Sequence, residues 1–221
     1  AEVIFFKEGG AFDSEHTQQV LSRRLKNTKN AVIPGFYGAM PNDTIKTFSR
    51  GGSDITGSIV ARAAGAVLYE NFTDVPGFLV ADPRIVKDPK VIRVITYQEL
   101  RELSYMGATV LHEDAIFPVS RAGIPINIRN TNDKSAQGTL IVKGEEDMAE
   151  LIKQNDSVIT GIAGKKGFSV IYIEKQMMNS EIGFGRKVLE VLEKKEISFE
   201  HLPSGVDTMS IVVEKAALAG K

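Results

Sequence analysis

Cysteine and tryptophan are both absent from this chain of 221 residues. Without cysteine the protein forms neither a disulfide nor a thiolate metal site, which fits a reducing cytoplasm. No apolar run is long enough to span a bilayer, and the start lacks the pattern of a signal peptide. The 27 Lys and Arg residues nearly balance 28 Asp and Glu residues, so no strong field attracts nucleic acid or an anionic membrane. We therefore expect a cytoplasmic protein that binds neither of them.

Hydrophobic residues make up 43% and charged residues 25% of the chain, the usual mixture of a globular protein. In the first part, short apolar runs that suit strands alternate with segments of helical periodicity. This alternation favours an α/β fold with a parallel-type sheet that is covered on both faces. The predicted strands lie at 31–33, 45–48, 67–72 and 125–128, and 45–48 is the returning strand of a hairpin. The predicted helices begin at a cap of Asp13 or Ser14, at a capping Ser53 or Asp54, and at the capping box of Thr96 and Glu99.

The composition changes after residue 130, where loop residues and then a charged segment follow. We place a first domain at 1–140, a linker at 141–157 and a second domain at 158–221. In the second domain the predicted order is strand, strand, helix, strand, strand, most of a ferredoxin-like unit without its last elements. The predicted strands there are 158–163, 168–174, 198–202 and 208–214, and the predicted helix is 183–195.

A glycine pair in the sequence SRGGSD forms a corner ahead of a helix. Gly51 and Gly52 let a ligand approach the backbone closely, and the N–H groups at a helix start favour an anion. Arg50 suits a carboxylate or phosphate, Ser53 can donate a hydrogen bond, and Asp54 suits an ammonium group. The corner therefore offers groups for both ends of a free amino acid. The alternative is an ordinary capped turn with a surface arginine.

The sequence TDVPGFLVADPR follows a predicted strand. Polar groups at the carboxyl end of a strand in an α/β sheet lie where ligands usually bind. Thr73, Asp74 and Arg84 suit a nucleotide, since they offer a hydroxyl, a carboxylate and a guanidinium. The alternative is that Asp74 and Asp82 are turn residues.

The three histidines, His16, His112 and His201, lack the spacing of metal ligands. We expect His112 to be a structural hydrogen-bonding residue. No Walker-type phosphate loop is present, so the sequence predicts no metal site of its own and no P-loop nucleotide site.

Several segments, in order along the chain, resemble the later portion of the aspartokinases, members of the amino acid kinase family that carry appended ACT domains. The resemblance implies the C-terminal part of an amino acid kinase three-layer α/β fold, followed by a partial ferredoxin-like ACT domain of α+β type. It also implies that the protein begins upstream of residue 1. The segments are VIPGFYG (32–38), SRGGSD (49–54), ENFTDVPGFLVADPRIV (70–86), ELRELSYMGATVLHEDAI (99–116) and IPINIRNT (124–131).

The activity that the resemblance implies is transfer of the γ-phosphoryl group of ATP to the side-chain carboxylate of L-aspartate, with Mg²⁺ offsetting the phosphate charge. This is the first step of lysine, threonine and methionine biosynthesis. By the same resemblance Asp54 is the catalytic residue. The substrate residues are Arg50, Gly51, Gly52 and Ser53, and the nucleotide residues are Thr73, Asp74, Arg84, Thr109 and Val110.

The tail resembles the first part of the aspartokinase ACT region, which implies an amino-acid effector such as lysine or threonine. The positions that match the effector loop and its neighbour are Met177, Ser180, Phe184 and Asp207, with one inserted residue near Glu181. Because ACT units pair between subunits in this family, the resemblance implies a homodimer.

Three departures from the family pattern bear on activity. The chain lacks the phosphate-binding Lys-Gly-Gly strand of the family, Leu79 replaces a tyrosine, and Thr109 replaces a lysine. We therefore expect these 221 residues alone to be inactive. The alternative function is an amino-acid-sensing ACT module with a non-catalytic, kinase-like scaffold. SRGGSD and the ACT-like tail argue against a kinase for glutamate or a nucleoside monophosphate.

Overall fold

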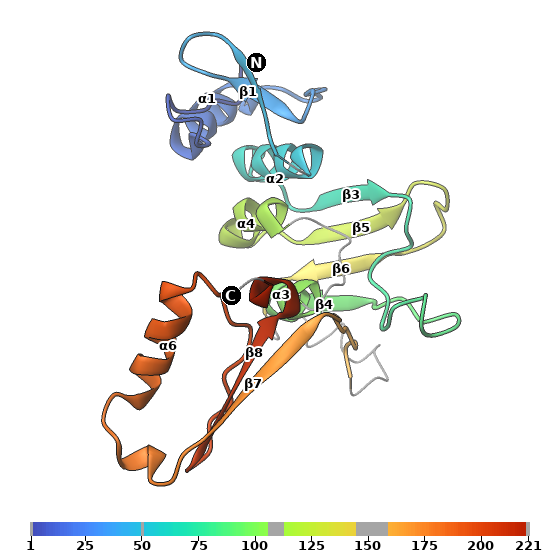
Figure 1. Cartoon of the computed structure of the whole chain (residues 1–221). Coiled ribbons are helices and arrows are strands. Elements are labelled where there is room, and N and C mark those ends of the chain that lie inside the picture. The colour runs from blue at the N-terminus through green and yellow to red at the C-terminus, as the bar shows by residue number, and fades with distance from the viewer. Residues whose placement is uncertain (1, 50, 106–112, 145–158, 220–221) are drawn as a thin grey trace. The chain divides into compact units, whose positions relative to one another are not determined.

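The computed structural model describes residues 2–49, 51–105, 113–144 and 159–219 (Figure 1). The chain divides into two compact units, Ala1–Gly164 and Lys165–Lys221. Within the described residues, no helix is both long enough and apolar enough to cross a bilayer.

The first unit is built on a four-stranded sheet in the order β3-β5-β6-β4. β3 and β5 are parallel, as are β4 and β6, whereas β5 and β6 run antiparallel. The sheet is therefore mixed: two parallel pairs of the expected type are joined by one antiparallel pair. The strands are β3 (Tyr69–Thr73), β4 (Val94–Thr96), β5 (Ile126–Asn130) and β6 (Thr139–Val142).

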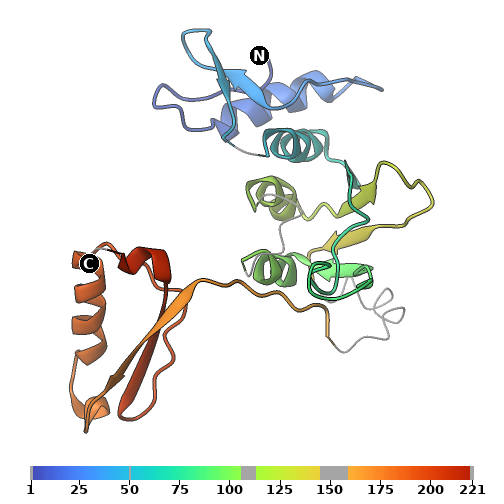
Figure 2. The ribbon, with the colours of Figure 1, turned by 45° about the vertical axis from the view of Figure 1, so that its right-hand side comes forward.

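Three helices lie along one side of this sheet, as Figure 2 shows. They are α2 (Gly52–Ala64), α3 (Tyr97–Tyr105) and α4 (Glu113–Ala122). Their apolar faces and the inward residues of the sheet form one core, whose members Ile59, Ile95, Leu100, Val119, Ile126, Ile128 and Ile141 are fully buried. Each such side chain contributes about 1.5–3 kcal/mol by leaving water.

The N-terminal part of the unit consists of α1 (Ser14–Leu25) and a hairpin of β1 (Tyr37–Ala39) and β2 (Ile45–Thr47). Asp13 caps α1, because its carboxylate accepts a hydrogen bond from the His16 N–H at 3.1 Å. The helix after Asp13 and the returning strand at 45–48 are confirmed as α1 and β2, whereas the first strand of the hairpin is Tyr37–Ala39 rather than 31–33.

The capping box at the start of α3 is also confirmed. Glu99 accepts from the Thr96 N–H at 2.9 Å, and the Glu99 N–H donates to the Thr96 hydroxyl at 3.1 Å. Glu99 accepts a further hydrogen bond, from the Thr160 hydroxyl at 2.6 Å. Burial alone would raise the pKa of Glu99, but the hydrogen bonds from Thr160 and Thr96 outweigh it and lower that pKa.

The second unit contains β7 (Phe168–Glu174), α6 (Phe184–Lys194) and β8 (Thr208–Glu214), with short 3₁₀ turns η1 (Met178–Ser180) and η2 (Lys215–Leu218). β7 and β8 pair antiparallel over their whole length. The side chains of Met178, Leu192, Met209, Ile211 and Val213 form its core. The helix at 183–195 and the strands at 168–174 and 208–214 are confirmed.

Several predicted strands are not strands. Residues 31–33 form none, and the Val32 side chain is 100% exposed because no element covers it. Residues 159–163 lack strand pairing, and 198–202 form only a single bridge, between His201 and Val212. β3 begins at Tyr69 rather than at 67, where Val67 is exposed.

The division between the units differs from the expected one. Ile141 and Val142 belong to β6, so a linker that begins at 141 is wrong. The first unit continues to Gly164. Just before its end, the Ile162 N–H donates to the Val80 carbonyl at 2.7 Å, which holds this segment to the unit. Most of the predicted linker, 145–157, lies outside the described residues.

Candidate functional site

The glycine corner begins α2 without a side-chain cap. Gly51 is the N-cap and has a left-handed backbone with φ 61°, which glycine adopts without steric cost. Gly52 is the first helical residue, so Ser53 and Asp54 lie in the first turn and do not cap it, contrary to expectation. A Cβ at Gly52 would lie 3.0 Å from the Phe48 Cβ.

Thr56 fastens the loop before β1 to this corner. Its hydroxyl donates to the Gly52 carbonyl at 2.7 Å and accepts from the Phe36 N–H at 3.0 Å. Phe36 has φ 86°, an unusual value for a residue with a side chain. The buried hydroxyl therefore holds a strained loop beside the N-terminus of α2.

Asp54 is hydrogen-bonded to β3 through the side chains of Asn71 and Tyr69. The Asn71 side-chain amide donates to Asp54 Oδ1 at 2.9 Å and to the Tyr69 hydroxyl at 3.0 Å. The Tyr69 hydroxyl in turn lies 3.3 Å from the Asp54 backbone carbonyl, to which it donates. Burial raises the pKa of Tyr69, the hydrogen bond from Asn71 lowers it, and the charge of Asp54 raises it further, for a net increase.

Thr73 and Asp74 stand at the carboxyl end of the same strand. Thr73 is the last residue of β3, and its hydroxyl donates to Asp74 Oδ1 at 3.2 Å. Alternate residues of a strand face the same side, so Tyr69, Asn71 and Thr73 share the face that meets α2. The predicted substrate corner and the predicted nucleotide residues Thr73 and Asp74 therefore lie on adjoining elements.

Arg84 is engaged by its neighbour Asp82. The guanidinium donates to both carboxylate oxygens, with Nη2 to Oδ2 at 2.6 Å and Nε to Oδ1 at 3.0 Å. These hydrogen bonds lower the pKa of Asp82 to about 2. The Arg84 side chain is 85% exposed, so the pair lies at the surface.

The loop between Asp74 and Arg84 is anchored at its middle. Gly77 has φ 130°, and a Cβ there would lie 2.5 Å from the Thr139 hydroxyl. Phe78 is buried, and its N–H donates to that hydroxyl at 2.8 Å. The loop is thus fixed to β6, a strand that was not predicted from the sequence.

Three predicted site residues, Arg50, Thr109 and Val110, lie outside the described residues, as does His112. Among the residues that the structure describes, no group of three or more His, Asp or Glu side chains could hold a metal ion.

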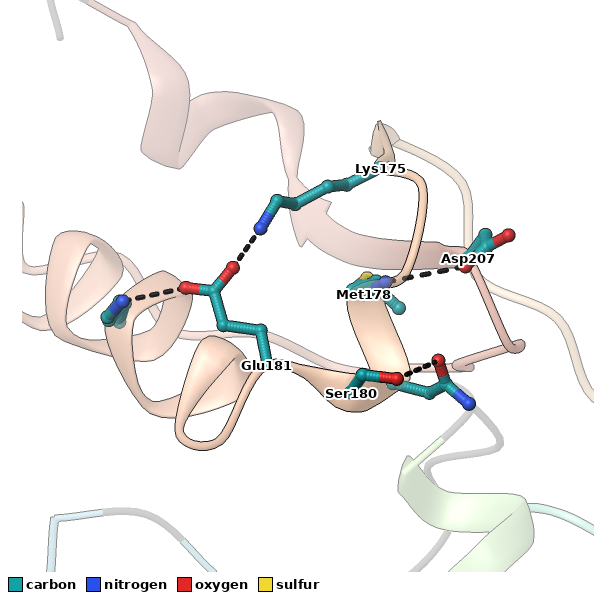
Figure 3. A network of polar contacts seen from close by, with 7 residues as sticks. Lys175, Met178, Ser180, Glu181 and Asp207 are labelled. Carbon is teal, nitrogen blue, oxygen red and sulfur yellow. Dashed lines mark hydrogen bonds and ion pairs between the residues drawn. The ribbon is translucent and has the colours of Figure 1, made fainter.

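The predicted effector residues lie in the second unit. Met177 and Ser180 lie in the turn between β7 and α6, Phe184 is the first residue of α6, and Asp207 directly precedes β8. Figure 3 labels Ser180 and Asp207. The Asp207 carboxylate accepts from the Met178 N–H at 3.3 Å, while Met177 is exposed. The Ser180 hydroxyl donates to Asn179, and Phe184 packs on the core of the unit. Asp207 is therefore joined to the turn through Met178 rather than Met177.

Glu181 connects two lysines across this turn, as Figure 3 shows for Lys175. One carboxylate oxygen pairs with Lys175, and the other lies 2.7 Å from Lys187 Nζ. The Lys175 ammonium also lies 5.4 Å from the centre of the Phe184 ring. The inserted residue near Glu181 was evident from the sequence, but this ionic cluster was not predicted.

Two cavities of the first unit lie away from the predicted residues. One of about 380 Å³ lies between α1 and residues 31–37. The other, of about 900 Å³, is lined by side chains of α2, α3 and α4, among them Arg62, Arg101 and Arg121. None of the predicted site residues within the described ranges lines either cavity.

The sequence pattern of the amino acid kinase family matches residues 5–130, more than half of the chain. Aspartokinase 3 of Bacillus subtilis is 43% identical over 99% of the chain, which covers 48% of that protein. Aspartokinase 1 (chloroplastic) of Arabidopsis thaliana is 30% identical over 85% of the chain and 32% of its own length.

Solved structures agree. Aspartate kinase of Clostridium acetobutylicum superimposes with a TM-score of 0.84 and 56% identity over 100% of this chain and 50% of that one. E. coli aspartokinase III in complex with lysine and aspartate matches with a TM-score of 0.70 and 25% identity, over 98% of this chain and 48% of that one. The chain thus spans about half the length of these bacterial relatives, and the expected amino acid kinase fold is confirmed. The chain belongs to the amino acid kinase family.

Proposed function

We propose that the protein to which this chain belongs is a cytoplasmic aspartate kinase, which transfers the γ-phosphoryl group of ATP to the β-carboxylate of L-aspartate. The observation that carries the proposal is the 2.9 Å hydrogen bond between Asn71 and Asp54. It joins the first turn of α2 to β3, two residues before Thr73. An amino acid at the corner would thus lie beside a nucleotide at the end of the strand.

In this proposal the corner binds aspartate through opposite charges. The Arg50 guanidinium faces a substrate carboxylate, Ser53 donates a hydrogen bond, and Asp54 attracts the ammonium group. Gly51 and Gly52 admit the substrate close to the backbone, where the first N–H groups of α2 favour an anion.

ATP occupies the end of β3 in this proposal. Thr73 and Asp74 contribute a hydroxyl and a carboxylate, oxygen donors of the kind that Mg²⁺ accepts when phosphates supply its other ligands. Arg84 exchanges Asp82 for a phosphate, and Thr109 and Val110 complete the site. Mg²⁺ offsets the negative charge of the phosphates when it is bound.

The reaction needs two anions to meet in line. A β-carboxylate oxygen of aspartate bonds to the γ-phosphorus while the bond to the ADP oxygen breaks, which gives an acyl phosphate and ADP. Since little covalent chemistry falls to the protein, positioning and charge neutralisation supply most of the catalysis. The strained Phe36 loop and the Asp54 contacts supply rigidity at this corner.

Regulation belongs to the second unit in this proposal. We assign it an ACT-type role in which Met177, Ser180, Phe184 and Asp207 surround an effector amino acid, lysine or threonine. The solved complex of E. coli aspartokinase III contains lysine and aspartate, which supports this class of effector. One face of the β7–β8 pair leaves Val170 and Tyr172 exposed, an apolar surface that supports pairing of two copies.

The second candidate is an amino-acid sensor with a kinase-like scaffold that does no chemistry. The ion pair between Arg84 and Asp82 is the observation in its favour, because it occupies the guanidinium that a phosphate would need.

Aspartate-dependent release of ADP by the full-length protein distinguishes the two candidates. The kinase proposal predicts release with aspartate and Mg²⁺-ATP, and none with glutamate or UMP as acceptor. The 221-residue chain alone should release none. Binding of lysine or threonine without any aspartate-dependent ADP would favour the sensor.

A further inference from the structure

Asp54, Asn71 and Tyr69 are joined by three hydrogen bonds, which hold Asp54 from the side of β3. Both hydrogens of the Asn71 amide have acceptors, Asp54 Oδ1 at 2.9 Å and the Tyr69 hydroxyl at 3.0 Å. Asn71 is 9% exposed, so its amide is shielded from competing water. We infer that Asn71, supported by Tyr69, is a positioning residue that aims the Asp54 carboxylate at the ammonium group of the amino-acid substrate. The inference rests on the proposed function.

The orientation of the Asn71 amide is set by chemistry. An ionised carboxylate only accepts hydrogen bonds, so the NH₂ group must face Asp54, and the amide oxygen would be repelled there. A neutral donor also leaves the negative charge of Asp54 in place, whereas a lysine at this position would neutralise it. Asn71 thus orients the charge without cancelling its attraction for a cation.

Tyr69 is the second hydrogen-bond partner of Asn71, and it is itself held in place. Its hydroxyl donates to the Asp54 backbone carbonyl at 3.3 Å and accepts from Asn71. Gly57 permits this approach, because a Cβ there would lie 2.5 Å from the Tyr69 hydroxyl. Side chain and backbone of Asp54 are therefore both held from β3.

One carboxylate oxygen remains for a ligand. In the described part of the chain, Oδ1 of Asp54 accepts from Asn71, and Oδ2 has no protein donor. A carboxylate held through one oxygen presents the other in a fixed direction, which lowers the ordering cost of binding an ammonium group.

The experiment measures the aspartate KM, the ATP KM, kcat and Tm of the full-length protein with Asn71→Leu, which has a similar volume and no donor. We expect the aspartate KM to rise roughly tenfold, as for a lost hydrogen bond to a charged group, with the ATP KM within about twofold. Asn127→Leu in the neighbouring strand is the matched control. It should leave the aspartate KM unchanged, whatever it does to Tm.

Asn71→Asp keeps the shape of the side chain and provides a second readout if the leucine variant does not fold. Two facing carboxylates share a proton more readily at low pH, and the protonated one then donates as the amide does. The ratio of variant to wild-type aspartate KM should therefore fall as the pH is lowered from about 8 to about 6.

The outcomes separate the two claims. A wild-type protein without aspartate-dependent ADP release overturns the proposed function and this inference with it. The inference alone is overturned if the wild type is active and the Asn71 variants have a lower Tm but the wild-type aspartate KM at every pH. An equal rise of the aspartate and ATP KM values also overturns it.

Discussion

The Thr160 hydroxyl donates to the Glu99 carboxylate at 2.6 Å, across 61 positions of sequence. The same carboxylate caps α3 by accepting from Thr96. One side chain thus ties the segment that precedes the second unit to the start of a core helix.

Glu99→Gln should therefore destabilise the first unit by about 1 kcal/mol, since it weakens the cap and the bond to Thr160 together. The pKa of Glu99 is lowered in the folded protein, so its contribution is complete above the unfolded value of 4.5 and is lost as the pH falls through the folded value. Urea unfolding at several pH values tests this. If the difference in free energy of unfolding between wild type and variant stays constant from neutral pH to below the folded pKa of Glu99, the prediction is contradicted.

Asp82→Asn should strengthen ATP binding in the full-length protein, because Arg84 then no longer has to break its ion pair with Asp82 before it binds a phosphate. The pKa of Asp82 is about 2, so the pair stays ionised at neutral pH and lowering the pH to 5 does not imitate the variant. The ATP KM is the measurement, and Asp88→Asn, a neighbour of the same charge, is the control. A higher ATP KM for Asp82→Asn alone would show that Asp82 assists the nucleotide site.

Gly57→Ala and Gly185→Ala make the same change in two helices with opposite expected results. A Cβ at Gly57 would lie 2.5 Å from the Tyr69 hydroxyl, so α2 must shift from β3 at a cost of about 1–3 kcal/mol. At Gly185 the nearest atom is Met209 Cε at 3.7 Å, so alanine should stabilise α6 by about 0.5–1 kcal/mol. Calorimetric unfolding measures both, and equal effects would contradict the close packing of α2 on Tyr69.

Glu181→Gln should weaken the binding of the effector amino acid. Without the carboxylate, Lys175 and Lys187 repel each other and the turn between β7 and α6 loses its ionic clamp. Calorimetric titration with lysine and with threonine measures the affinity. Glu190→Gln is the matched control, because Glu190 also pairs with two basic residues, but within α6. Equal affinities for Glu181→Gln and wild type would remove the cluster from the effector site.

Local sequence signals predicted the elements that depend on neighbouring residues. The cap at Asp13 and the box of Thr96 and Glu99 were confirmed because their partners lie three positions apart. The 31–33 run failed because apolar composition alone does not supply a partner strand, and Val32 is exposed. β6 was missed because its role depends on pairing with β4 and β5, from distant parts of the chain.

In the candidate site, too, the residues with a local sequence signal were predicted, and those that depend on contacts with distant elements were not. Asp54 and Thr73 were predicted from their motif and strand end, and they lie on the adjoining elements α2 and β3. Asn71 and Tyr69 were missed, because an asparagine and a tyrosine in a strand carry no signal until α2 is placed against them. Thr56 was missed for the same reason, since its hydroxyl bonds the Phe36 backbone from the next element.

The aspartate KM of the full-length protein with Arg50→Ala tests the central claim most directly. If the corner before α2 holds a substrate carboxylate, loss of the guanidinium should raise the aspartate KM roughly tenfold or more and leave the ATP KM within about twofold. An aspartate KM equal to that of the wild type would show that aspartate binds elsewhere.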